Sequence, residues 1–231
     1  MFSRRLPLLF TLLFLSSATS YCAEKIMRCV YFNPPAGAPD VMFAHVADKV
    51  IEVPMPSMNL STPLDPPSGE YVVRFSDKRV LPPETPAGDT VNLKLTENDR
   101  KFILLVYPNP KQKGLPITVS KVTIDSSFPL GSMMWINTTR NLVGGKIGTE
   151  TLLLKPGAIV RTKAPSKEKG GYSVRLDYQA PKSREQKMLV NTMWRHDPNS
   201  RQFIFVTSMP DTDIPAVNAV ADFEMPEPVT P

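Results

Sequence analysis

The sequence predicts an all-β protein made of two tandem antiparallel β-sandwich modules related by internal duplication. Three observations predict this fold: apolar residues alternate with polar ones over short stretches, turn-forming residues separate these stretches, and the second half of the chain repeats the first. The chain has 25 prolines in 231 residues, about twice the usual share. Because proline breaks helix interiors, this abundance favours strands separated by ordered loops.

The N-terminal residues 1–20 have the organisation of a secretory signal peptide. Arg4 and Arg5 precede an apolar run over 6–15, and small residues follow as far as Ser20. The apolar run is too short for a membrane anchor, which takes about 20 such residues. We therefore expect cleavage after Ser20 and an exported protein, periplasmic or extracellular, with no membrane span once the signal is removed.

Two cysteines, Cys22 and Cys29, follow the signal. A lipid anchor on Cys22 is disfavoured because Tyr21 occupies the position where lipoprotein processing takes a small residue. A disulfide between the two would require the chain to fold back, since seven extended residues span about 23 Å. The sequence leaves open whether Cys22 is lipidated, paired with Cys29 or removed.

The first predicted module, residues 25–125, contains clear strand patterns. Apolar residues occupy every second position over 71–75 and 91–95, which is typical of strands with one buried face. The segment 102–106 is continuously apolar, and this predicts a central strand buried on both faces.

The second predicted module, residues 131–223, repeats the first. A shift of 101 positions places Tyr172 on Tyr71 and, without a gap, Phe203 on Phe102. Each unit has about 95 residues, a length typical of an immunoglobulin-like sandwich. We therefore expect two immunoglobulin-like modules followed by a disordered tail at 224–231. The alternative is one continuous sandwich whose two sheets have similar sequences.

The segment 28–41, Arg-Cys-Val-Tyr-Phe-Asn-Pro-Pro-Ala-Gly-Ala-Pro-Asp-Val, resembles the opening strand of tandem secreted bacterial β-sandwich domains of unknown function. The stretch 67–73 resembles their Pro-Ala-Gly-x-Tyr-x-Val strand, and 102–106 resembles their closing strand. The second unit departs from the pattern, because 137–139 is not followed by an Ala-Pro element. The resemblance covers 27–223 in outline and implies an envelope or extracellular β-sandwich, with no catalytic residues to carry over.

Charge patterning argues against nucleic acid as a partner. The formal charge of +5 becomes +3 when Arg4 and Arg5 leave with the signal. The remaining cations are interleaved with acidic residues, whereas a nucleic-acid binder typically shows a clustered basic stripe with aromatic residues. We interpret these charges as a solvated surface.

No catalytic or metal-binding motif is present in the sequence. The two histidines, His45 and His196, belong to no His-Glu-x-x-His pattern, and no nucleophile-elbow serine motif occurs. We expect His196, in an Asp-Pro-Asn turn, to be exposed to solvent. The glycines at 144–148 lack phosphate-loop spacing and are interpreted as hairpin or bulge residues. We expect no metal, no cofactor and no enzymatic activity.

The candidate binding residues are Trp135 and Trp194, the only tryptophans, both on predicted strands of the second module. We expect a non-catalytic exported protein that acts through protein binding or as a structural component, with strand edges as contact surfaces. One alternative is carbohydrate binding through these two tryptophans. Another is a hydrolase with paired carboxylates in a cleft between the modules. Any function should be sought where the two copies differ.

Overall fold

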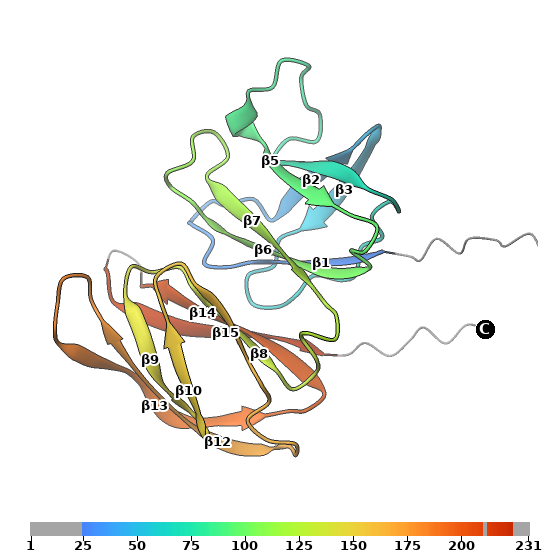
Figure 1. Ribbon diagram of the computed structural model, residues 1–231. Helices are drawn as coiled ribbons and strands as arrows, with labels where there is room; N and C mark the ends of the chain where they lie inside the picture. The colour runs from blue at the N-terminus through green and yellow to red at the C-terminus, as the bar shows by residue number, and fades with distance from the viewer. Residues whose placement is uncertain (1–24, 210–211, 224–231) are drawn as a thin grey trace, which may run out of the picture.

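The computed structural model describes residues 25–209 and 212–223 (Figure 1). The described residues form four β-sheets and one short 3₁₀ turn, η1 (Ala87–Asp89), which confirms the predicted all-β, sandwich-like class. They contain no helix that is long and apolar enough to cross a membrane. The predicted signal peptide, Cys22 and the tail at 224–231 lie outside the described residues.

Module 1 has an outer and an inner sheet. The outer sheet has the strand order β3-β2-β4-β5 and the inner sheet the order β1-β6-β7. The strands are β1 (Ile26–Tyr31), β2 (Val41–Val46), β3 (Lys49–Pro54), β4 (Tyr71–Ser76), β5 (Val91–Leu95), β6 (Lys101–Pro108) and β7 (Ile117–Thr123).

Module 2 has the same two-layer plan. Its outer sheet has the order β10-β9-β12-β13 and its inner sheet the order β11-β8-β14-β15. The strands are β8 (Met133–Asn137), β9 (Leu142–Ile147), β10 (Glu150–Leu154), β11 (Ile159–Thr162), β12 (Gly170–Gln179), β13 (Gln186–His196), β14 (Ser200–Ser208) and β15 (Pro215–Phe223).

The strands of the two modules pair in the same way. In each inner sheet the first strand is parallel to the next-to-last one: β1 to β6, and β8 to β14. With the strands of module 1 lettered in chain order, its sheets are CBDE and AFG. Constant-type immunoglobulin domains have ABED and CFG instead. The strand order therefore differs from the immunoglobulin-like order that we expected.

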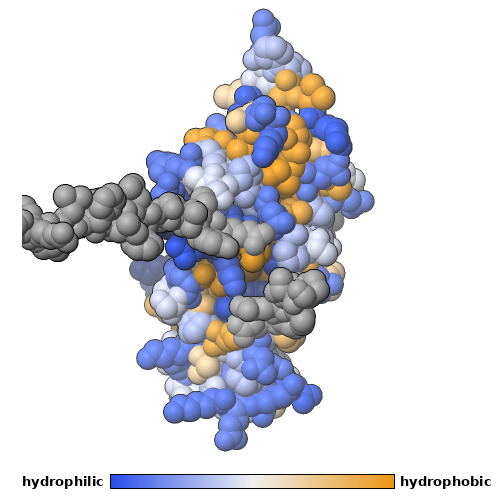
Figure 2. Space-filling model, turned by 90° about the vertical axis from the view of Figure 1, so that its right-hand side faces the viewer, coloured by the Kyte–Doolittle hydropathy of each residue, from blue (hydrophilic) through white to orange (hydrophobic). Residues whose placement is uncertain are grey.

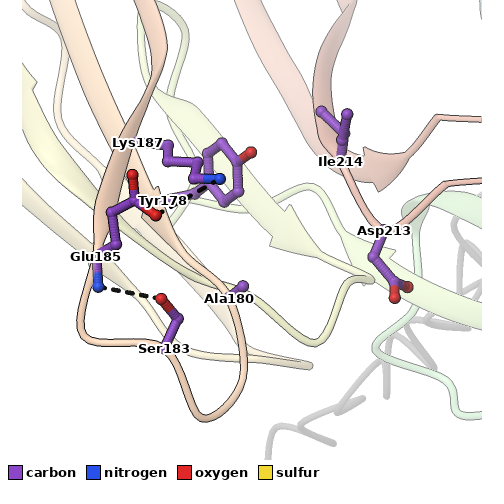
Figure 3. A pocket seen from close by; sticks show the side chains of 7 residues that line it. All are labelled: Tyr178, Ala180, Ser183, Glu185, Lys187, Asp213 and Ile214. Atoms are coloured by element: carbon purple, nitrogen blue, oxygen red, sulfur yellow. Dashed lines mark hydrogen bonds and ion pairs between the residues drawn. The ribbon is translucent and has the colours of Figure 1, made fainter.

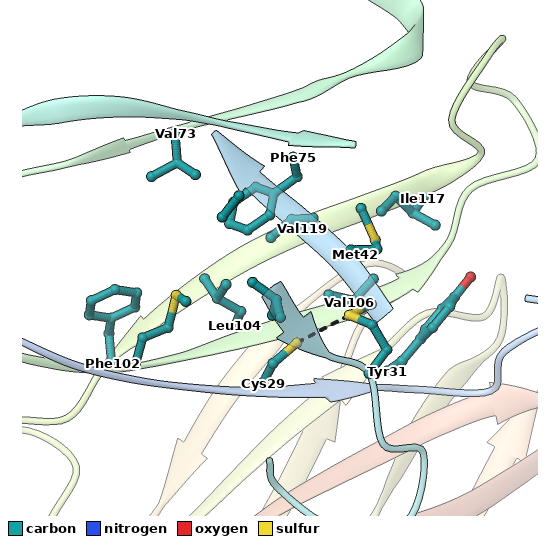
Figure 4. Close-up of a cluster of buried hydrophobic side chains, with 14 of the residues drawn as sticks. Cys29, Tyr31, Met42, Val73, Phe75, Phe102, Leu104, Val106, Ile117 and Val119 are labelled. Carbon is teal, nitrogen blue, oxygen red and sulfur yellow. Dashed lines mark hydrogen bonds between the residues drawn. The ribbon is translucent and has the colours of Figure 1, made fainter. Parts of the chain in front are cut away.

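The four sheets stack in the order outer 1, inner 1, inner 2, outer 2, so the two inner sheets face each other (Figure 1). Both faces of the inner sheets are thus covered, and their central strands are apolar throughout. On β6, Phe102 and Leu104 face the core of module 1 (Figure 4), whereas Ile103 and Leu105 face module 2. The prediction that 102–106 is buried on both faces is confirmed.

The layer between the modules is an apolar core of its own. Phe32 of β1's C-terminal extension stacks on Phe205 of β14, and Phe128, which precedes β8, packs edge-on against Phe203. All four rings are buried. Aromatic pairs of this kind stabilise a contact by more than the burial of their apolar area alone. They therefore help to hold the two modules together as one stack.

The ungapped alignment of the two modules pairs some residues that face different layers of the structure. Tyr71 and Tyr172 both face their own module's core. Phe102 faces the core of module 1, but Phe203 faces the layer between the modules. Since side chains on a strand alternate between faces, the alignment of the two modules is out of phase by an odd number of residues on β6 and β14.

Candidate binding edge at strand β13

Trp135, the first candidate binding residue, is fully buried in module 2. Its indole Nε1 donates to Thr162 Oγ1 at 3.2 Å, and its ring stacks on Trp194 with centroids 5.8 Å apart. Trp194 is half-buried and packs edge-on against Tyr172. A ring enclosed like that of Trp135 has no face free to stack on a sugar. The pair belongs to the module's core.

The prediction that His196 is exposed is wrong. His196 is only 3% exposed, and its ring lies edge-on to Tyr172 with centroids 6.4 Å apart. It ends β13 two positions after Trp194, so the strand period places it on the same, core-facing side. The turn begins one residue later, at Asp197. His45 on β2 is half-buried, with its Nε2 3.0 Å from the Lys78 carbonyl oxygen.

Across residues 25–209 and 212–223, no three His, Cys, Asp or Glu side chains come close enough together to hold a metal ion.

The largest difference between the modules is the hairpin of β12 and β13. These strands have 10 and 11 residues, whereas their counterparts β4 and β5 have six and five. In module 1 the connection between β4 and β5 is a proline-rich loop that contains only η1. In module 2 the hairpin remains paired from Gly170↔His196 to Gln179↔Gln186. The two modules therefore differ most in the strand that forms one edge of outer sheet 2.

Strand β13 is the longest edge strand among the described residues. It pairs with β12 alone, so its other side carries backbone groups that pair with no described strand. The next longest edge strand, β15, has nine residues and begins with Pro215. A register shift makes Leu189 an additional residue between the pairs Val190↔Leu176 and Met188↔Asp177, which is a β-bulge.

Two apolar side chains of β13 point into solvent. Met188 is 67% exposed and Met193 is 65% exposed. The opposite side of the strand contributes Leu189, Val190 and Trp194 to the module's core. Exposed apolar groups occur elsewhere too, and on the side of the molecule in Figure 2 the largest apolar area lies on the upper half, which is module 1. Among the described strands, β13 combines such groups with the longest unpaired edge.

A pocket of about 170 Å³ lies at the hairpin end of β13, between the two sheets of module 2 (Figure 3). Glu185 and Lys187 form one side, where they make an ion pair at 3.6 Å, and Ile214 and Asp213 lie across from them. Tyr178, Ala180 and Ser183 complete the lining. This volume is below the range of drug-sized ligand sites and suits a single side chain.

A buried ion-pair network fills part of the space between the modules. Asp222 accepts from Arg28 at 2.8 Å and from Arg201 at 3.0 Å. Burial raises the pKa of Asp222, and the two guanidinium groups oppose that rise. With the apolar core beside it, this network occupies the place where the hydrolase alternative requires a cleft.

No protein-family model matches the chain, and no curated protein matches it either.

The sequence did not single out β13, because its bulge interrupts the alternation of apolar and polar residues over 186–196. Gly144 and Gly145 lie inside β9, in the hairpin that β9 forms with β10, and Gly148 lies in the turn of that hairpin, which confirms the hairpin interpretation of these glycines. The adjacent glycines were nevertheless a signal at β9, since glycine inside a strand often marks a close approach of another group.

Proposed function

We propose that this chain is a non-catalytic exported binding protein that holds a protein partner by strand addition along β13. The observation that carries the proposal is the length of this edge, 11 residues with no second neighbour strand in the described part of the chain. In strand addition, backbone hydrogen bonds supply affinity, and pockets for alternate side chains supply specificity. The exposed Met188 and Met193 and the pocket at the hairpin end could serve as such contacts.

The export signal and the duplication are part of the same proposal. We infer that the two modules descend from one ancestral sandwich, supported by the common pairing of β1 with β6 and β8 with β14. Duplication leaves one copy free to change, and β13 is where module 2 departs most from module 1. Export is tested by N-terminal sequencing of the mature protein, for which we expect Tyr21 as the first residue.

Site-specific photo-crosslinking in the producing cells tests the strand addition. A photoreactive amino acid at Asn191, an exposed position on β13, is expected to give a discrete adduct with another protein. The matched control is the same group at Val72 on β4, which is 53% exposed but lies on a strand with neighbours on both sides. We expect no adduct from Val72.

A second variant separates edge pairing from simple proximity. Met188→Lys places a charge beside the edge, a change that disfavours added strands and leaves the core untouched. We expect it to reduce the adduct from Asn191 while the circular dichroism spectrum is unchanged. Equal adducts from Asn191 and Val72, or an adduct unaffected by Met188→Lys, would contradict strand addition at β13.

A further inference from the structure

The solvent-facing side of outer sheet 2 carries a hollow of about 370 Å³ beside the pocket at the β13 edge, with which it shares Tyr178 as a lining residue. Its volume falls in the lower part of the range for ligand sites. Strand pairing places Leu153 of β10, Gly144 of β9 and Asp177 of β12 in one row across the sheet. The glycine thus lies between an apolar side chain and a carboxylate. The other lining residues are Leu142, Gly145, Thr151, Leu152, Tyr178, Gln179 and Gln186.

Gly144 opens this hollow, and the backbone does not require a glycine there. A Cβ added at Gly144 would meet the Leu152 carbonyl oxygen at 3.4 Å and Leu153 Cδ1 at 3.5 Å, which are ordinary contacts. Its neighbour Gly145 is different, because a Cβ there would overlap the Arg175 carbonyl oxygen. Glycine inside a strand costs about 0.5–1 kcal/mol relative to alanine. Packing within the fold therefore does not explain why residue Gly144 has no side chain.

The polar side chains of the hollow are the carboxylate of Asp177 and hydroxyl and amide groups that can both donate and accept hydrogen bonds. Asp177 is half-buried and makes no ion pair or side-chain hydrogen bond with another described residue. Gln179 Nε2 donates to the Ser183 carbonyl oxygen at 2.5 Å, which leaves Gln179 Oε1 as an acceptor and the second N–H as a donor. Asp177 is also the one charged residue in the lining. A ligand with hydrogen-bond donors and a positive charge would therefore complement Asp177.

We propose that this hollow binds the guanidinium group of an arginine side chain from a polypeptide. Guanidinium has five N–H donors and no acceptor, and its planar fork matches a carboxylate. The aliphatic stem of arginine would lie against Leu142 and Leu153, as long basic side chains commonly do on apolar surfaces. The site adjoins β13, because Gln186 lines it and Asp177 pairs with Met188, but it requires no added strand and stands whether or not strand addition occurs.

The cations near the hollow set a limit on its affinity. Lys146 and Arg175 pair with each other two positions along the same strands, and by the strand period they lie on the same face. Neither lines the hollow. Their charges repel an incoming cation, so the attraction must come from direct contact with Asp177. Removing one of these charges should strengthen binding.

Amide NMR of the ¹⁵N-labelled mature chain tests the proposal. Titration with Nα-acetyl-arginine amide is expected to shift the amides of Gly144, Gly145 and Asp177 in a saturable way. Nα-acetyl-citrulline amide has nearly the same shape without the charge, and we expect no saturable shift from it. Asp177→Asn should weaken arginine binding by about tenfold or more, because a charge-assisted hydrogen bond is lost. Lys146→Met should strengthen it.

Gly144→Val supplies the steric variant. Valine favours strands and its side chain would fill the hollow, so we expect lost binding with an otherwise unchanged amide spectrum. Equal shifts from the arginine and citrulline probes, or full binding by Asp177→Asn, would overturn the proposal. A saturable response to glucose, mannose or N-acetylglucosamine without one to arginine would overturn it in favour of a sugar site. Tighter binding of free arginine than of the capped form would overturn the polypeptide source.

Discussion

Arg28 on β1 and Asp222 on β15 form an ion pair of 2.8 Å that joins the two modules across 194 positions of sequence. Arg28 Nε also donates to the Ser61 carbonyl oxygen at 2.8 Å, and Arg201 binds the second oxygen of Asp222. The three charged side chains are largely buried. The network therefore specifies how inner sheet 1 sits on inner sheet 2, in a layer where apolar contacts alone have little directional preference.

Removing Asp222 should be strongly destabilising. Asp222→Ala leaves two buried guanidinium groups without their carboxylate, and breaking a buried ion pair in this way costs about 3–5 kcal/mol. Urea unfolding followed by tryptophan fluorescence measures the loss. The control is Glu52→Gln, which removes the exposed partner of Arg79 and should leave the unfolding midpoint unchanged. A small effect at Asp222 would mean that the apolar layer alone holds the modules together.

The stability contribution of Asp99 should depend on pH. Burial by itself would raise the pKa of Asp99, but the ion pair with Lys121 at 2.6 Å and the hydrogen bonds from Thr96 outweigh it and hold the pKa below the usual range. The folded-state pKa is thus lower than the unfolded one, so the carboxylate stabilises the fold above the unfolded pKa of about 3.9. That contribution is lost as the pH falls through the folded-state pKa.

The measurement is the difference in unfolding free energy between the unmodified chain and Asp99→Asn at pH 7, 5, 4 and 3. We expect the difference to be constant from pH 7 to 5 and to shrink toward pH 3. Lys121→Met removes the cationic partner of Asp99. In this variant the unfolding free energy should therefore depend less on pH over the same range than it does in the unmodified chain. A difference that stays the same over the whole series would show that the charge of Asp99 is not what stabilises the fold.

Adjacent glycines on β9 should respond very differently to substitution. Gly145→Ala forces a methyl group into the Arg175 carbonyl oxygen on the neighbouring strand, and we expect a loss of about 3 kcal/mol or more. Gly144→Ala meets only ordinary contacts and should change stability by no more than about 1 kcal/mol. Thermal unfolding of the two variants provides a matched comparison. Equal losses of stability would show that both positions require glycine for steric reasons, which would contradict the prediction.

Cys29 should be unreactive in the folded protein. Its thiol is fully buried, 3.6 Å from Met55 Sδ, and burial raises its pKa to about 12 (Figure 4). Because the thiolate is the reactive form, a thiol reagent at pH 8 should not label Cys29 until the chain is unfolded. Cys22→Ser removes the other cysteine, so that one thiol per chain is measured. Rapid labelling of this variant without denaturant would contradict the burial.

The strand patterns were predictable from the sequence because each one records a local requirement. Alternation over 71–75 and 91–95 reflects one face against the core, and the structure has strands there. The continuous apolar run at 102–106 reflects two buried faces, which the structure also has. Export and cleavage after Ser20 stay predictions. The sequence thus determined where strands form and how many of their faces are buried.

Tertiary structure alone decided which neighbours those faces meet. Phe102 and Phe203 align in sequence yet face different layers, because a phase difference of one residue turns a side chain to the other face while the run stays apolar. Trp135 and His196 were assigned to a binding site and to solvent, but packing against Trp194 and Tyr172 encloses them. The free edge of β13 and the row of Leu153, Gly144 and Asp177 likewise exist only through pairing between strands far apart in the chain. Local pattern encodes burial, whereas the partners in a contact depend on the whole fold.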